Sequence, residues 1–248
     1  MTSRPLKIKN AARQAITHTS PFAQSNRAKS GSLLIFDCDG VLVNSERLVS
    51  RIEAHHLESL GLQLSPDEVR ALFKGRTAGE VTAAVAEMIG RPVPLDWVFD
   101  WAMLTANAFV HELKAIPGIE AVLRHFAGQN QAMCVASQSS PARVALSLRV
   151  ASLDGYFGSN VYTASMVEYP KPAPDLFLFA ARKMGFAPEF CTVIEDSPVG
   201  VIGARAAGMQ VFGYAADENA NTLSEAGATV FYSMEDLIGL LTERLSRQ

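Results

Sequence analysis

The chain has 248 residues, a length that fits one large domain or a domain that carries an insertion. Hydrophobic residues make up 48% and charged residues 19% of the sequence, which excludes a wholly disordered protein. The net charge of −3 does not provide the basic surface that favours nucleic-acid binding, and no run of 18 apolar residues predicts a membrane-spanning helix.

The first 30 residues have the composition of a basic leader. Residues 1–36 carry six basic residues and no acidic one, whereas the remainder carries 16 basic and 25 acidic residues. The leader lacks an apolar period, so we expect disorder over 1–30, although organelle transit peptides share this composition. Three widely spaced cysteines within apolar runs favour a reducing compartment and predict a cytoplasmic protein.

Short apolar runs alternate with helical patterns along most of the chain. The run at 33–36, followed by Asp-Cys-Asp-Gly, has the length of a buried strand. Comparable runs predict strands at 133–136, 192–194 and 211–214. Helical periodicity covers 117–128, 141–150, 174–185, 198–208 and 235–246. This alternation predicts an α/β fold with a doubly wound parallel sheet.

The stretch between the first two predicted strands breaks the alternation. Helical spacing continues from Glu46 to Leu113, which is too long for a simple crossover connection. We therefore expect an α-helical cap domain at 45–114, inserted into a core that consists of 31–44 and 115–248.

Polar side chains follow the predicted strands at the points where they end. Because the carboxyl ends of parallel strands meet at one edge of a sheet, these side chains are expected to lie close together. They are Asp37 and Asp39 after the first strand, Ser137 and Gln138 after the second, and Glu195 and Asp196 after the third. Lys171, between two prolines just before a predicted helix, is expected to join them.

This set combines four carboxylates with one lysine and one hydroxyl. Carboxylates so close together repel one another unless a cation lies among them. Oxygen ligands without His or Cys favour Mg²⁺, which normally shares its coordination shell with a substrate phosphate. The residues therefore predict phosphoryl transfer on a small phosphorylated metabolite.

Four segments, taken together and in order, resemble the signature motifs of the haloacid dehalogenase superfamily. They are FDCDGVLVNSE from Phe36, VASQS from Val135, YPKPAPD from Tyr169 and IEDSPVG from Ile194. The resemblance extends over 33–246 and includes a helical cap between the first two motifs. Within the superfamily, the chain most resembles the sugar-phosphate phosphatases and the β-phosphoglucomutase-like members.

The resemblance implies a role for each residue that matches a motif. Asp37 matches the nucleophile that forms an aspartyl-phosphate, and Asp39 matches the general acid that later acts as a base. Ser137, Gln138 and Lys171 match the segments that bind the phosphoryl group.

The resemblance also implies a Mg²⁺ site and marks one departure. Its ligands would be the Asp37 carboxylate, the backbone carbonyl of Asp39, and Asp196, with Glu195 as a further ligand. From the residues alone, Glu195 could instead hydrogen-bond a loop. Asn44 stands where many members carry Asp, in the segment that links core and cap.

Two cations in the cap bear on the choice of substrate. Lys74 and Arg76 flank Gly75 between two predicted cap helices. They predict a second anionic group on the substrate, such as the carboxylate of the sugar-acid phosphate 6-phosphogluconate. The alternative is that both side chains stabilise a helix C-terminus through its dipole.

A sugar phosphomutase like β-phosphoglucomutase is the main alternative function. Such a mutase has a His and an Arg in its cap, and those positions fall at Val49 and near Ala78, although Arg76 lies two residues before the latter. The mutase signature is therefore incomplete, and hydrolysis is favoured. A non-catalytic binding protein on the same fold would not need the pair Asp37 and Asp39, and a haloacid dehalogenase needs neither Asp39 nor Asp196. We therefore expect a Mg²⁺-dependent phosphatase, a monomer or weak homo-oligomer, without nucleic-acid or membrane partners.

Overall fold

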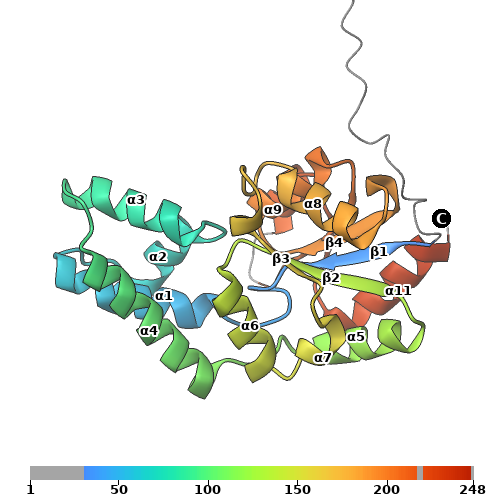
Figure 1. Cartoon of the computed structure of the whole chain (residues 1–248), viewed down its shortest axis with the longest axis horizontal. Helices are drawn as coiled ribbons and strands as arrows, with labels where there is room; N and C mark the ends of the chain where they lie inside the picture. Colours follow the sequence, from blue (N-terminus) through green and yellow to red (C-terminus); the bar gives the residue numbers. More distant parts are fainter. Residues whose placement is uncertain (1–30, 217–219, 247–248) are drawn as a thin grey trace, which may run out of the picture.

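The computed structural model describes residues 31–216 and 220–246. The basic leader predicted at 1–30 lies outside the described residues. The chain forms a sheet flanked by helices, with a further group of helices to one side of it (Figure 1).

Six parallel strands form the sheet in the order β3-β2-β1-β4-β5-β6, which confirms the predicted doubly wound fold. Chain order reverses beside β1, and such a switch point is where ligands bind in sheets of this type. β3 and β6 have three residues each, too few to show a period, and the sequence does not predict them. The strands are β1 (Leu33–Phe36), β2 (Ala132–Ser137), β3 (Val161–Thr163), β4 (Cys191–Glu195), β5 (Gln210–Tyr214) and β6 (Thr229–Phe231).

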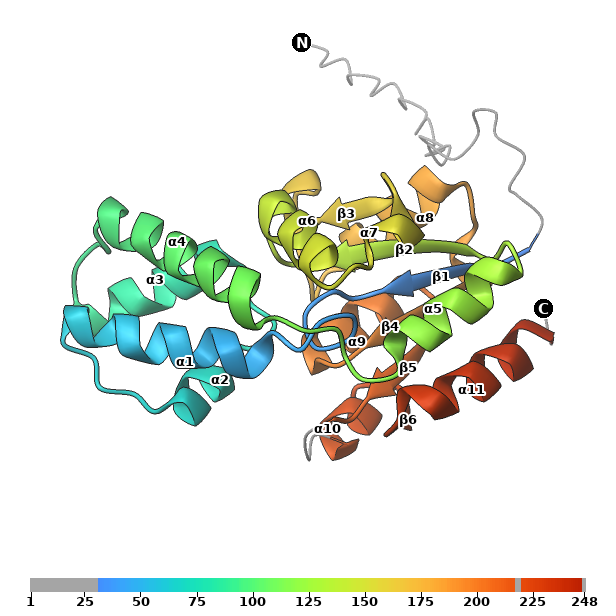
Figure 2. The same cartoon turned by 90° about the horizontal axis from the view of Figure 1, so that it is seen from below.

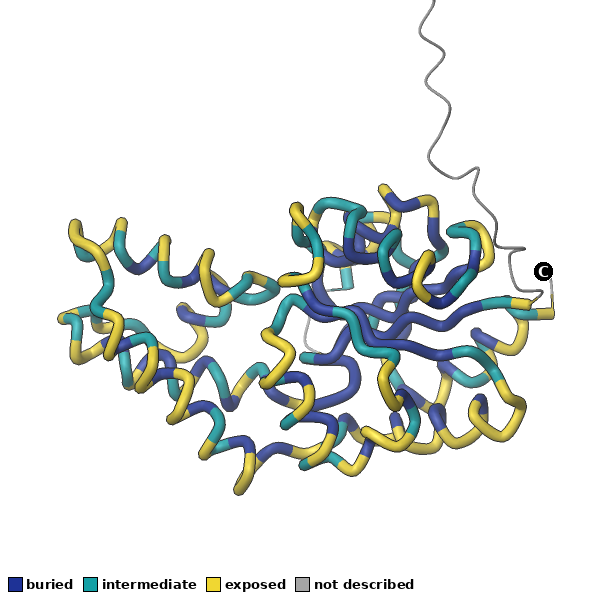
Figure 3. Tube along the Cα trace, viewed as in Figure 1, coloured by how far each residue is buried: buried dark blue, intermediate teal, exposed yellow. Residues whose placement is uncertain are grey.

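Helices cover both faces of the sheet, and the central strands β1, β2 and β4 are almost wholly buried (Figure 3). Residues of β1 alternate between two apolar clusters: Leu34 and Phe36 pack on one face, and Leu33 and Ile35 on the other. On the first face lie α5 (Ile119–Gly128), α6 (Pro141–Val150), α7 (Asp154–Phe157) and α11 (Met234–Ser246). On the second lie α8 (Asp175–Met184), α9 (Pro198–Ala206) and α10 (Ala220–Glu225).

Short 3₁₀ helices complete the described secondary structure. They are η1 (Glu58–Leu60), η2 (Ala164–Met166) and η3 (Pro188–Phe190). None of the helices in 31–216 and 220–246 combines the length and the apolar character needed to cross a bilayer.

The helices to the side of the sheet pack around an apolar core of their own. Trp97 and Trp101 lie in this core. The first turns of two of the helices are stabilised by capping boxes, formed by Ser65 with Glu68 and by Thr77 with Glu80. The helices, called the cap below, are α1 (Glu46–Leu57), α2 (Pro66–Phe73), α3 (Ala78–Ile89) and α4 (Leu95–Glu112).

The two segments that connect cap and sheet lie side by side (Figure 2). Val43 forms an antiparallel bridge with Ala115. The Asn44 N–H donates to the carbonyl of Lys114 at 2.9 Å. The chain therefore leaves the core and returns to it at adjacent points.

We predict that Phe126→Ala on α5 lowers the free energy of unfolding by about 3–5 kcal/mol, because it opens a cavity in a fully buried site. Ile202→Ala on α9 is the control, since that side chain is 48% exposed and its loss should cost about 1 kcal/mol or less. Urea denaturation of both variants measures the difference, and equal losses would contradict the placement of Phe126 in the core.

Candidate active site

A buried ammonium joins the ends of three neighbouring strands. Lys171 is 2% exposed, and its Nζ donates to Asp37 Oδ1 at 2.6 Å and to Glu195 Oε1 at 2.6 Å. Its third hydrogen bond goes to the carbonyl of Ala136 at 2.9 Å. All three donors of the ammonium are therefore satisfied, and the Asp37 carboxylate is fixed beside a positive charge.

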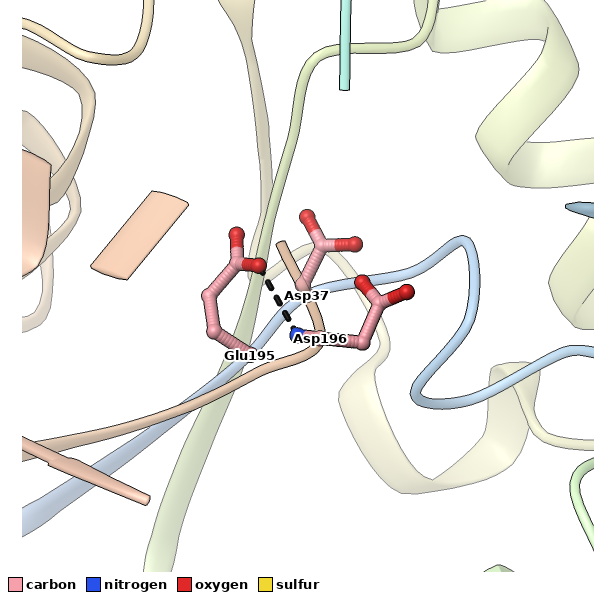
Figure 4. A group of neighbouring side chains, drawn as sticks. All are labelled: Asp37, Glu195 and Asp196. Carbon is pink, nitrogen blue, oxygen red and sulfur yellow. Dashed lines mark hydrogen bonds between the residues drawn. The ribbon is translucent and has the colours of Figure 1, made fainter. Parts of the chain in front are cut away.

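Three buried carboxylates face one another at this edge of the sheet (Figure 4). Asp37, Glu195 and Asp196 each offer an oxygen within 4.8 Å of the others. Burial raises the pKa of Asp37 well above its usual value, and the charges of Glu195 and Asp196 raise it further, against the opposing effect of Lys171. Burial also raises the pKa of Asp196 to about 6. An oxygen-only set with excess negative charge fits a hard cation such as Mg²⁺.

Glu195 also holds the loop between β4 and α9. Its Oε2 accepts hydrogen bonds from the N–H of Asp196 and from the N–H and Oγ of Ser197, each at 2.9 Å. Since Oε1 pairs with Lys171, both oxygens have partners. These contacts support the loop-binding alternative for Glu195, and its role as a metal ligand stays a prediction.

Asp39 is held by three groups from two parts of the chain. Its carboxylate accepts hydrogen bonds from Ser45 Oγ at 2.5 Å, from Ser139 Oγ at 2.7 Å and from the Arg143 guanidinium at 3.0 Å. Burial alone would raise the pKa of Asp39, but Arg143 and the two hydroxyls outweigh it and lower the pKa below its usual value. These contacts favour the ionised form of the Asp39 carboxylate over the protonated form.

The sequence does not single out these partners of Asp39. Ser139 follows β2 and could have been found by the same rule that identifies Ser137. Arg143 lies in the first turn of α6, and nothing in the sequence pattern separates it from a surface arginine. Ser45 precedes α1 and looks like an ordinary helix N-cap, although its side chain makes no cap hydrogen bond.

Ser137 and Gln138 lie in the loop after β2. The Oγ of Ser137, a 1% exposed residue, accepts a hydrogen bond from the Ser139 N–H at 3.1 Å. The Gln138 side chain donates hydrogen bonds to the carbonyls of Lys171 at 3.1 Å and Gly75 at 3.3 Å. It therefore connects the segment that carries Lys171 to the cap. Phosphate binding by Ser137 and Gln138 stays a prediction.

The two cap cations differ in their surroundings. Lys74 is the C-cap residue of α2, and its Nζ lies 2.6 Å from Asp196 Oδ2 and 3.3 Å from Glu46 Oε2. Burial and the charge of Asp196 raise the pKa of Glu46 to about 7, against the opposing effect of Lys74. Arg76 is exposed at the edge of the same pocket. Lys74 thus connects the cap to a carboxylate of the core.

A pocket of about 380 Å³ lies between the cap and the end of the sheet. Polar side chains from the loops after β1, β2 and β4 line its floor. Side chains of α1, α2 and α4 line its cap side, and those of α2 and α4 are mostly apolar. This arrangement can hold a phosphate at the floor and an attached organic group against the cap. All predicted site residues line it: Asp37, Asp39, Lys74, Arg76, Ser137, Gln138, Lys171, Glu195 and Asp196.

Comparisons with known proteins agree with this geometry. The chain is 29% identical to the 6-phosphogluconate phosphatase of Escherichia coli (strain K12), over 82% of this chain and 91% of that protein. It is 30% identical to hexitol phosphatase A of the same organism, with the same coverage of 82% and 91%. A solved HAD family hydrolase from Deinococcus radiodurans R1, with bound phosphate and sodium, has a TM-score of 0.70 and 33% identity, covering 86% of this chain and 96% of that one.

A family model provides the assignment. Residues 32–208, more than half of the chain, match the model of the haloacid dehalogenase-like hydrolases. The matched range includes the strands β1, β2 and β4 and every predicted site residue. The chain therefore belongs to the haloacid dehalogenase-like hydrolase family and is a phosphoric monoester hydrolase.

Proposed function

We propose that this protein is a Mg²⁺-dependent phosphatase that hydrolyses a small sugar-type phosphate through an aspartyl-phosphate on Asp37. The observation that carries the proposal is the buried Asp37 carboxylate, which lies 2.6 Å from the Lys171 ammonium at the floor of a pocket. Relatives named for phosphatase activity on sugar-acid and hexitol phosphates support the substrate class.

In the first step, Ser137 donates to one phosphoryl oxygen, and Lys171 exchanges one of its three present hydrogen bonds for a bond to another. An oxygen of Asp37 then attacks phosphorus. The bond to the leaving oxygen breaks, and this oxygen takes a proton from Asp39, which must be protonated in the substrate complex although its partners in the structure lower its pKa. In the second step, Asp39 accepts a proton from water, which attacks the phosphorus of the aspartyl-phosphate. Inorganic phosphate leaves and Asp37 is restored.

The proposed metal site consists of the Asp37 carboxylate, the Asp39 backbone carbonyl and Asp196. When bound, Mg²⁺ would neutralise charge on the phosphoryl group and on the surrounding carboxylates. Lys74 Nζ lies 2.6 Å from one oxygen of Asp196, so this residue would be shared between the metal and the cap.

The choice of substrate depends on the cap. Lys74 is paired with two carboxylates, so a distal carboxylate such as that of 6-phosphogluconate would depend on Arg76. Val49 and Ala78 line the pocket where a mutase would carry its His and Arg, which favours hydrolysis over phosphomutase activity. We also propose that the protein acts in the cytoplasm, because its three cysteines are buried and free. A monomer or weak homo-oligomer stays a prediction.

We predict that Asp37→Asn abolishes phosphate release while the fold is retained, since the amide keeps the shape of the side chain but is not a nucleophile. A phosphate-release assay and a circular dichroism spectrum of the same preparation measure both effects. Activity above a tenth of wild type with a normal spectrum would remove Asp37 from this role.

We predict that chelation with EDTA abolishes activity, that Mg²⁺ restores it and that Ca²⁺ does not. Ca²⁺ takes 6–8 ligands in looser geometry, which disturbs in-line attack. The measurement is phosphate release after metal removal and after each addition. Full activity in the exhaustively chelated enzyme would rule out the metal requirement.

We predict that Asp39→Asn reduces the hydrolysis of a sugar phosphate by about 10²–10⁴-fold, because a sugar alkoxide leaves poorly without a proton donor. The leaving group of p-nitrophenyl phosphate needs no proton. The rate of the first step with this substrate should therefore fall far less. Presteady-state release of p-nitrophenol separates that step from the later attack of water. Equal losses for both substrates would contradict the acid role of Asp39.

A further inference from the structure

Three polar groups of buried residues on the cap side of the pocket have no hydrogen-bond or ion-pair partner among residues 31–216 and 220–246. Glu53 on α1 and Trp101 and Thr105 on α4 all line the pocket, and each is 6% exposed. Trp101 Nε1 and Thr105 Oγ1 have no hydrogen-bond partner within the described residues. Within the same residues, no hydrogen bond or ion pair holds the Glu53 carboxylate. The charge that acts on its pKa is that of Arg143.

The unsatisfied tryptophan contrasts with its neighbour one turn away on the same helix. The Nε1 of Trp97, also 6% exposed, donates to the carbonyl of His56 and to Ser59 Oγ, each at 3.1 Å. The cap therefore satisfies an indole N–H where no ligand is expected. The indole N–H that has no partner is the one that lines the pocket. A buried polar group without a partner destabilises the protein unless a ligand pairs with it.

The chemistry of these three groups restricts what can pair with them. An indole N–H only donates hydrogen bonds, an ionised carboxylate only accepts them, and a threonine hydroxyl does both. A ligand carboxylate cannot donate to Glu53 and is repelled by its charge, whereas an ammonium cannot accept from Trp101. Hydroxyl groups both donate and accept hydrogen bonds. The carbon chain that carries them can pack against the apolar walls of the pocket.

We propose that Glu53, Trp101 and Thr105 form a hydroxyl-binding subsite that selects an uncharged polyol as the leaving group. The proposal rests on the phosphatase function above, in which the floor of the pocket binds the phosphoryl group. It narrows the substrate class to phosphates of sugar alcohols or neutral sugars and makes 6-phosphogluconate the poorer substrate. Burial raises the pKa of Glu53 to about 7 against the opposing charge of Arg143. The rejection of 6-phosphogluconate by charge is therefore expected above that pH, where Glu53 is ionised, whereas a hydroxyl pairs with either protonation state.

The test compares kcat/KM on three six-carbon substrates: glucitol 6-phosphate, 6-phosphogluconate and hexyl phosphate, which lacks the other hydroxyls. In the wild type, we expect glucitol 6-phosphate to exceed both others by at least about tenfold, since a site built to bind hydroxyls rejects analogues without them. p-Nitrophenyl phosphate, which needs only the floor of the pocket, reports on the hydrolytic machinery itself.

Variants then assign the preference to residues. Thr105→Val and Trp101→Phe should each lower kcat/KM on glucitol 6-phosphate by about 5- to 30-fold and leave hexyl phosphate nearly unchanged. Glu53→Gln should narrow the ratio between glucitol 6-phosphate and 6-phosphogluconate, because the repelling charge is gone. The matched control is Glu87→Gln, an exposed residue of α3 outside the pocket, which should change nothing.

The outcomes separate the two proposals. If the wild type releases phosphate from none of these substrates, both the phosphatase function and the subsite are contradicted. If it does release phosphate, but the variants weaken glucitol 6-phosphate and hexyl phosphate equally, the three residues stabilise the cap and do not bind hydroxyls. A wild type that prefers 6-phosphogluconate to glucitol 6-phosphate also overturns the subsite while leaving the phosphatase function intact.

Discussion

The buried ammonium of Lys171 is the constraint on which the rest of the site depends. Removing a charge from water costs several kcal/mol unless nearby groups compensate for it. Here Asp37, Glu195 and the carbonyl of Ala136 do so, and they come from the ends of three adjacent strands. One side chain therefore fixes the relative positions of three loops. Without Lys171, two buried carboxylates would face each other with no positive charge between them.

The same crowding of carboxylates leaves room only for glycine at two nearby positions. Gly40 adopts a positive φ of 83°, and a Cβ there would overlap the carboxylate of Asp196. A Cβ at Gly200, in the first turn of α9, would overlap the carboxylate of Glu195. The glycine within the first motif and the glycine that closes the last motif thus have a steric cause, since the buried acidic groups occupy the space that any larger residue would need.

The sequence predicts the floor of the site well because chemistry and strand order coincide there. Asp37, Ser137 and Asp196 each follow a recognisable apolar run, so the topology of a parallel sheet suffices to bring them together. The sequence does not predict that Arg143 and Glu53 line the site, and the reason is the same for both. Both lie on helices, and which side of a helix meets the pocket depends on how cap and core pack, which local periodicity does not encode. The short strands β3 and β6 are missed because three residues show no period.

The bridge between Val43 and Ala115 has a consequence for how such a protein diversifies. Because the helical segment leaves and re-enters the core at neighbouring points, it can be lengthened, shortened or exchanged without changing the strand order. Recombination at this junction would join the cap of one protein to the core of another. The sequences of cap and core could then change at different rates. A gene for such a chain behaves as two evolutionary modules, although the polypeptide is continuous.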